Sequence, residues 1–253
     1  IYNFIHEHHT IIPNIPIVLC SKGIDENTLL LQSEVIQKFC TKNVIAVLTG
    51  PSFADELAKG LPTALTLACE NTNVRDYLQK SLSTQTLRLY SSSDIIGAQI
   101  GGSLKNIMAI AAGICDGIGY GDNSKAAILT RGMNEMTRLG VKMGANKPTF
   151  SGLSGIGDLL VTALSKHSRN RFVGEQIGLG KSVDEVTKSM DMVAEGINTC
   201  KAVPDLVRKY EVEMPISQSI NDILFKKKNP LKVVKELMTR KLGSENDWQI
   251  FKT

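Results

Sequence analysis

One lysine within a long apolar segment is the residue of this sequence that most clearly points to chemistry. Lys105 is the only charged residue between Asp94 and Asp116. The predicted helix 95–115 is apolar on nearly every face, so it should form a buried core. Lysine is rarely buried without a partner, and burial lowers the pKa of its ammonium toward neutrality. Lys105 is therefore a candidate proton donor and acceptor, unless it reaches solvent from the helix start.

A glycine-rich segment, 151–158, ends in a second candidate, Asp158. Asp158 and Thr162 are four residues apart and share one face of a helix. The aspartate could either cap that helix or pair with a lysine, and the sequence favours neither alternative. The spacing G-x-x-G-x-G and the lack of a preceding strand exclude a dinucleotide-binding turn here.

Two turns follow the first two predicted strands directly. They are Ser21-Lys22-Gly23 and the turn 50–54, Gly-Pro-Ser-Phe-Ala, in which Pro51 suits the first position of a helix. In an open parallel sheet, ligands bind beyond the carboxyl ends of the strands. Either turn could be a simple connection, but the pair, one of them with a lysine, modestly favours a site.

The segment Ser168-Arg169-Asn170-Arg171 should begin another helix. A serine cap, free helix amides and a guanidinium together can bind a phosphate group. Taken alone, the segment is more often a solvated, capped helix start.

The elements that position these residues fall into two parts. Strands are predicted at 15–20, 44–48, 63–68 and 86–90, and helices at 26–39, 52–59 and 74–82. Such alternation predicts a largely parallel α/β sheet. After the capping run 91–94 the periodicity is helical to residue 242; Gly178 and Gly180 close one helix, and a capping box at 182–185 opens the next. The predicted domains are 1–92 (α/β) and 93–242 (all-α), with 243–253 unassigned.

Composition excludes several classes of protein. The 253 residues are 42% hydrophobic and 21% charged, and 29 basic against 25 acidic residues give a net charge of +4. The chain is thus neither disordered nor markedly basic. Five widely spaced cysteines without C-x-x-C indicate free thiols in a reducing compartment. The longest apolar run, nine residues, is too short for a membrane span, and no signal peptide is evident, so we expect a cytoplasmic protein.

Two further patterns do not indicate a site. His6, His8 and His9 form a polar start rather than a metal site. Residues 226–241 contain six lysines and one arginine against Glu236, without interleaved aromatic residues. This basic segment is typical of a solvated helix face, and no nucleic-acid partner is predicted.

Together, these residues resemble the bacterial NAD(P)-dependent glycerol-3-phosphate dehydrogenase family. Seven segments in family order, spread over residues 15–241, carry the resemblance: 21–23, 50–54, 101–106, 155–159, 168–171, 193–196 and 213–216. It implies a partial Rossmann-type domain followed by a helical domain like that of 6-phosphogluconate dehydrogenase.

The implied reaction is hydride transfer between NAD(P)H and dihydroxyacetone phosphate, which yields sn-glycerol 3-phosphate for phospholipid synthesis. The resemblance also implies a small phosphorylated substrate and no membrane insertion, and it allows a homodimer. It matches Lys105 to the catalytic proton carrier, with Asp158 and Thr162 as its support. The implied substrate residues are Lys22, Gly50, Ser52, Lys105, Asp158, Ser168, Arg169 and Asn170. The implied cofactor residues are Lys22, Ala54, Arg169, Val193 and Glu195.

One departure from the family pattern concerns the cofactor. The family begins with a strand and a G-x-G-x-x-G turn for the pyrophosphate, and this sequence contains no G-x-G-x-x-G. We therefore expect the chain to begin partway through the nucleotide-binding domain, and the choice between NAD and NADP stays open. The alternatives are another β-hydroxyacid-type dehydrogenase of this architecture and a catalytically silent remnant.

Overall fold

The computed structural model describes residues 1–190 and 194–245. Its first part holds the strands β1 (Ile17–Leu19), β2 (Ile45–Thr49), β3 (Thr63–Ala68) and β4 (Leu87–Ser92). The helices of this part are α1 (Tyr2–His8), a 3₁₀ turn η1 (His9–Ile11), α2 (Gln32–Phe39), α3 (Ala54–Ala58) and α4 (Thr72–Leu82). Within the described residues, all regular structure beyond β4 is helical, as predicted.

The described strands form one sheet in the order β1-β2-β3-β4. The pairs β1–β2 and β3–β4 are parallel, as predicted, but β2–β3 is antiparallel. A parallel return requires a connection that runs back along the whole strand. At 1.5 Å per residue the five-residue α3 spans only about 8 Å, whereas β2 is about 16 Å long. The chain therefore turns back beside β2 in the opposite direction, which makes the sheet mixed.

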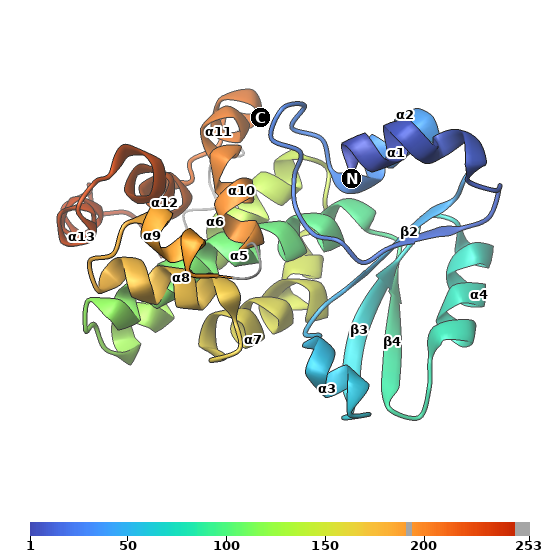
Figure 1. The fold of residues 1–253 in the computed structure, drawn as a ribbon, viewed down its shortest axis with the longest axis horizontal. Coiled ribbons are helices and arrows are strands. Elements are labelled where there is room, and N and C mark those ends of the chain that lie inside the picture. The colour runs from blue at the N-terminus through green and yellow to red at the C-terminus, as the bar shows by residue number, and fades with distance from the viewer. Residues whose placement is uncertain (191–193, 246–253) are drawn as a thin grey trace.

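Helices cover both faces of this sheet (Figure 1). On one face α1 and α2 pack against β1 and β2, where Ile5, Ile36 and Val47 belong to one apolar cluster. On the other face α4 packs against β3 and β4 through a second cluster that contains Leu78 and Leu89.

One of the two helices on the first face differs from the prediction. The histidine-rich start, expected as a polar surface segment with no predicted element, forms the mostly exposed helix α1, and two of its aromatic rings pack against Phe39 of α2. The helix predicted from residue 26 begins only at Gln32. The Asp25 carboxylate accepts hydrogen bonds from the amide and hydroxyl of Thr28, and Leu29 has a φ of +57°. Both features favour a turn and oppose an early helix start.

Helix α5 (Ile95–Gly117) runs through the centre of the helical part (Figure 1). By length and apolar composition α5 could cross a membrane, although no uninterrupted apolar run suggested this. However, 89% of its most apolar window is buried inside the protein, so α5 is the predicted core helix. Asp94 caps it by accepting a hydrogen bond from the amide of Gly97 at 2.8 Å.

The remaining helical segments surround α5. The first are α6 (Asp122–Lys142), the 3₁₀ turn η2 (Lys147–Ser151), the π-helical turn η3 (Leu153–Gly157), α7 (Asp158–Leu164) and α8 (Arg169–Gly178). They are followed by α9 (Val183–Lys188), α10 (Glu195–Lys201), α11 (Val203–Tyr210), α12 (Pro215–Lys226) and α13 (Pro230–Met238). As predicted, α8 ends at Gly178, and a capping box between Ser182 and Glu185 opens α9.

Glycines bring α5 and α8 into backbone contact. A Cβ atom at Gly113 of α5 would lie 2.0 Å from the carbonyl oxygen of Arg171, and one at Gly174 of α8 would lie 2.0 Å from that of Ile110. Two non-bonded atoms cannot approach this closely. In both cases the obstructing atom belongs to the backbone of the opposite helix, so no side-chain rotation can relieve the clash. The pairing of α5 with α8 therefore depends on these glycines.

We expect Gly174→Ala to lower the free energy of unfolding by about 2–3 kcal/mol, because α8 must move away from α5. Gly121→Ala is the matched control, since a Cβ atom there meets nothing within 4 Å; it should cost no more than about 1 kcal/mol. Urea denaturation of both variants measures the difference. Equal losses would contradict the glycine contact.

Candidate active site

Lys105 is buried, with 6% of its surface exposed, and does not reach solvent. Its ammonium forms an ion pair with the Asp158 carboxylate and donates a hydrogen bond to the hydroxyl of Thr162 at 2.7 Å. The Thr162 hydroxyl donates in turn to the main-chain carbonyl of Asp158 at 2.6 Å. Asp158 is thus a partner of lysine, the second alternative that the sequence left open.

Close backbone packing brings Asp158 to Lys105. The π-helical turn η3 leads into α7, whose first residue is Asp158. A Cβ atom at Gly101 would lie 2.1 Å from the carbonyl oxygen of Ser154, so η3 can rest on α5 only at a glycine. Gly101 is four residues before Lys105, one turn of the same helix away. Of the glycines that precede Asp158, Gly155 is also closely packed, because a Cβ atom there would lie 2.1 Å from the carbonyl oxygen of Phe150.

A second lysine joins the cluster from the sheet. Lys22 follows β1, and its ammonium contacts the second carboxylate oxygen of Asp158 at 2.7 Å. The next amide, of Gly23, donates to the hydroxyl of Ser103 on α5 at 2.9 Å. This hydrogen bond fastens the turn after β1 to the helix that carries Lys105. One buried carboxylate consequently faces two ammonium groups.

This environment changes the proton affinity of Lys105. Burial, followed by the positive charge of Lys22, lowers the pKa of the Lys105 ammonium to about 7, while the contact with Asp158 opposes the shift. A group with a pKa near neutrality can both donate and accept a proton at the pH of a cell. The cluster can therefore perform acid–base chemistry.

The turn after β2 lies beside the cluster but differs from its predicted form. Gly50 has a φ of +136°, and the Ser52 hydroxyl donates to the Gly50 carbonyl at 3.0 Å. Helix α3 begins at Ala54 rather than at Ser52, so Pro51 precedes the helix. The ring of Phe53 packs against that of His167, with centroids 5.9 Å apart. This contact joins the turn to the segment that leads into α8.

The start of α8 agrees with the predicted capped helix. The Ser168 hydroxyl accepts a hydrogen bond from the amide of Arg171 at 3.2 Å. Arg169 is exposed and Asn170 is buried. Arg171 is not part of the site, because its guanidinium forms an ion pair with Asp116.

Asn106 is a residue that the sequence interpretation did not include in the site. Its side-chain oxygen accepts a hydrogen bond from Asn170 at 3.0 Å, and its amide nitrogen lies 3.4 Å from the carboxylate of Glu195. The oxygen of Asn170 accepts from the amide of Gly196 at 2.9 Å. Asn106 therefore connects α8 and α10 to the helix of Lys105. Its position next to Lys105 was the available signal, but an asparagine alone specifies no role.

The predicted cofactor residues lie at the surface of this region. Ala54 and Glu195 are exposed at the starts of α3 and α10, and Lys22 is partly exposed. Val193 lies outside the described residues. The structure thus brings Lys105, Asp158, Thr162 and Lys22 into direct contact, with the other described candidates on the elements around them.

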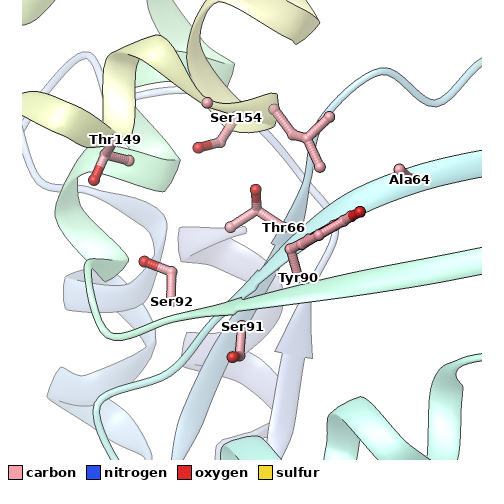
Figure 2. A pocket seen from close by; sticks show the side chains of 9 residues that line it. Ala64, Thr66, Tyr90, Ser91, Ser92, Thr149 and Ser154 are labelled. Carbon is pink, nitrogen blue, oxygen red and sulfur yellow. The ribbon is translucent and has the colours of Figure 1, made fainter.

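A separate hollow of about 400 Å³ lies between the sheet and the η2–η3 segment (Figure 2). Thr149 and Ser154 face Thr66 and Tyr90 across it. Its lining contains no charged residue and none of the predicted site residues. It is therefore poorly suited to a phosphorylated substrate.

Two family models match the chain. The model for the NAD-dependent glycerol-3-phosphate dehydrogenase N-terminus matches residues 1–75, and the model for the C-terminus of the same enzymes matches residues 94–235. The chain belongs to this dehydrogenase family. The predicted resemblance is thereby confirmed for both parts of the chain.

Individual relatives within the glycerol-3-phosphate dehydrogenase family agree. A glycerol-3-phosphate dehydrogenase (NAD(P)+) of Salinibacter ruber is 50% identical over 233 residues, which cover 91% of this chain and 68% of the relative. One from an Exiguobacterium species is 47% identical over 240 residues, 94% of this chain and 70% of the relative. The crystal structure of glycerol-3-phosphate dehydrogenase from Coxiella burnetii superimposes with a TM-score of 0.90 at 36% identity, covering 94% of this chain and 74% of that one. These similarities confirm the partial Rossmann-type sheet and the helical domain.

Proposed function

We propose that this chain interconverts dihydroxyacetone phosphate and sn-glycerol 3-phosphate with NAD or NADP as the hydride carrier. The buried contact of Lys105 with Asp158 and Thr162 carries this proposal. When a hydride reaches the ketone carbon, negative charge develops on its oxygen. A cationic lysine beside that oxygen stabilises the charge and supplies the proton. In the reverse direction the neutral amine accepts the proton of the alcohol.

The neighbouring residues complete this acid–base group. Asp158 forms ion pairs with both Lys105 and Lys22, and Thr162 fixes the direction of the Lys105 ammonium. Lys22 presents a second positive charge to an anionic substrate. Because Asp158 is only 1% exposed, solvent screens these interactions little.

The phosphate group of the substrate would bind at the start of α8. Ser168, Arg169 and Asn170 supply a hydroxyl, a guanidinium and an amide there, next to helix amides that favour an anion. Gly50 and Ser52 would close the opposite side, since Phe53 joins their turn to this segment.

Four described residues of this chain suit the nicotinamide end of the cofactor: Lys22, Ala54, Arg169 and Glu195. Lys22 contacts Asp158 directly, and Arg169 and Glu195 lie on α8 and α10, which both pack against the helix of Lys105. When bound, the reduced nicotinamide supplies the hydride. The sequence has no G-x-G-x-x-G, so the pyrophosphate seat of the family is not among the groups that this chain provides.

We propose domains at 1–92 and 93–242, because β4 ends at Ser92 and α5 begins at Ile95. Residues 243–253 have no proposed role. The product would supply phospholipid synthesis, and we place the protein in the cytoplasm as a homodimer.

The lowered pKa of Lys105 predicts a pH dependence. Reduction of the ketone needs the protonated lysine, so kcat for reduction should fall as the pH rises through about 7, and kcat for oxidation should rise. Lys22→Met removes a positive charge that lowers this pKa and should move the falling limb to higher pH. Lys80→Met, on α4, is the control. Profiles of kcat for reduction between pH 5.5 and 10 locate this fall in the wild type and both variants. If kcat fell at the same pH in all three proteins, the influence of Lys22 on the pKa of Lys105 would be contradicted.

Two measurements test the proposed function. Titration calorimetry should detect binding of glycerol 3-phosphate to the chain, and inorganic phosphate should bind more weakly. With NADH and dihydroxyacetone phosphate, the protein should oxidise NADH. Binding without oxidation would indicate a silent remnant, and oxidation only with other β-hydroxyacid-type substrates would indicate the alternative dehydrogenase.

A further inference from the structure

A buried hydroxyl without a partner lies beside the Lys22 side chain. Thr49 is the last residue of β2 and only 3% exposed. Among the described residues, its hydroxyl has no hydrogen-bond partner. Leaving a buried hydroxyl unpaired is costly, so such a group in a native protein calls for a physical explanation.

The position of this hydroxyl points to the substrate. A Cβ atom at Gly102 would lie 2.9 Å from the Thr49 hydroxyl and 3.5 Å from two carbons of the Lys22 side chain. Gly102 therefore keeps open a narrow space between Thr49 and Lys22. Lys105 is three residues further along α5, on the same side of the helix. The Thr49 hydroxyl therefore lies against α5 about one helical turn before Lys105.

A small cavity occupies this space. It measures about 10 Å³ and is lined by Ser21, Lys22, Gly23, Thr49, Gly102 and Ser103, among others. That volume accommodates one oxygen-sized group. The following residue, Gly50, begins the turn that we assign to the substrate, so the cavity borders the proposed site at the end of the sheet.

We propose that Thr49 is a further substrate-contacting residue, whose hydroxyl binds the terminal hydroxyl of dihydroxyacetone phosphate or glycerol 3-phosphate. This inference rests on the proposed function. The phosphate would lie at α8, the reacting oxygen at Lys105, and the hydroxymethyl end toward β2. Thr49 then selects substrates that carry a hydroxyl on the carbon next to the reacting one.

Paired changes in protein and ligand test this contact. The ligands are glycerol 3-phosphate and propane-1,2-diol 1-phosphate, which lacks only the terminal hydroxyl. The wild-type chain should bind glycerol 3-phosphate about tenfold more tightly than the deoxy ligand, the worth of one hydrogen bond. Thr49→Val, which keeps the shape of the side chain, should abolish this preference without weakening binding of the deoxy ligand more than about twofold. Thr49→Ser should retain the preference.

A matched control comes from the opposite strand. Thr66 pairs with Thr49 in the β2–β3 ladder, is also buried, and lines the separate hollow of Figure 2. Thr66→Val should keep the tenfold preference. Thermal unfolding verifies that each variant folds. If Thr49→Val does not fold, Thr49→Ala is measured in its place.

The results separate the two proposals. Suppose that the wild-type chain binds glycerol 3-phosphate, and that Thr49→Val lowers the affinity for both ligands equally or leaves both affinities unchanged. In that case the proposed role of Thr49 is wrong and the proposed function stands. If the wild-type chain binds neither ligand, the proposed function fails, and the role of Thr49 fails with it.

Discussion

Lys105→Ala is expected to lower kcat for reduction of dihydroxyacetone phosphate by about 10⁴-fold, because the variant loses both the proton donor and the charge beside the developing alkoxide. The affinity for glycerol 3-phosphate should stay within tenfold, since the phosphate contacts at Ser168 and Arg169 remain. Steady-state kinetics and calorimetry measure the two quantities separately.

An isosteric variant separates chemistry from packing. Lys105→Met fills nearly the same volume in the core and should lose as much activity as Lys105→Ala while it unfolds at a higher temperature. In both variants Asp158 keeps its contact with Lys22, so the carboxylate retains a partner. Turnover within tenfold of wild type in either variant would disprove the role of Lys105.

Asp158→Asn should have the second largest effect, a loss in kcat of about 10²–10³-fold. The Asp158 carboxylate contacts the ammonium groups of both Lys105 and Lys22 in a buried site. Removing its charge leaves two positive groups in contact with a neutral amide, which costs about 3–5 kcal/mol of stability when both stay charged. Lys105 relieves that cost by losing its proton, because its pKa falls further, and the proton donor is then missing at neutral pH.

The control for this variant is Asp116→Asn. Asp116 is also largely buried and also contacts two cations, Arg171 and Lys125, but it lies outside the Lys105 cluster. This change should lower the unfolding temperature and leave kcat within about threefold of wild type. If Asp116→Asn and Asp158→Asn reduced kcat equally, the effect of Asp158 would be one of stability rather than of catalysis.

The elements were largely predictable from local patterns. β3 lies where the sequence predicted it, and the helix starts at Ile95, Arg169 and Val183 follow from the caps at Asp94, Ser168 and Ser182. A cap acts over three or four residues, so sequence spacing alone reveals it. The wrong predictions concern the starts of α2 and α3 and the antiparallel β2–β3 pair, each of which depends on contacts or turns that hydrophobic periodicity does not encode.

For the candidate site, too, local sequence predicted one part and tertiary packing decided the rest. The sequence by itself determined that the helix of Lys105 is a core helix, because a helix that is apolar on nearly every face has no polar side to present to water. Whether Lys105 itself is buried or reaches solvent was left open by the sequence. Only the tertiary structure decided what Lys105 meets. Asp158 is 53 residues from Lys105, and Lys22 is 136 residues from Asp158. Their contact depends on η3 resting on Gly101 and on the Gly23–Ser103 hydrogen bond, which arise only when sheet and helices pack together.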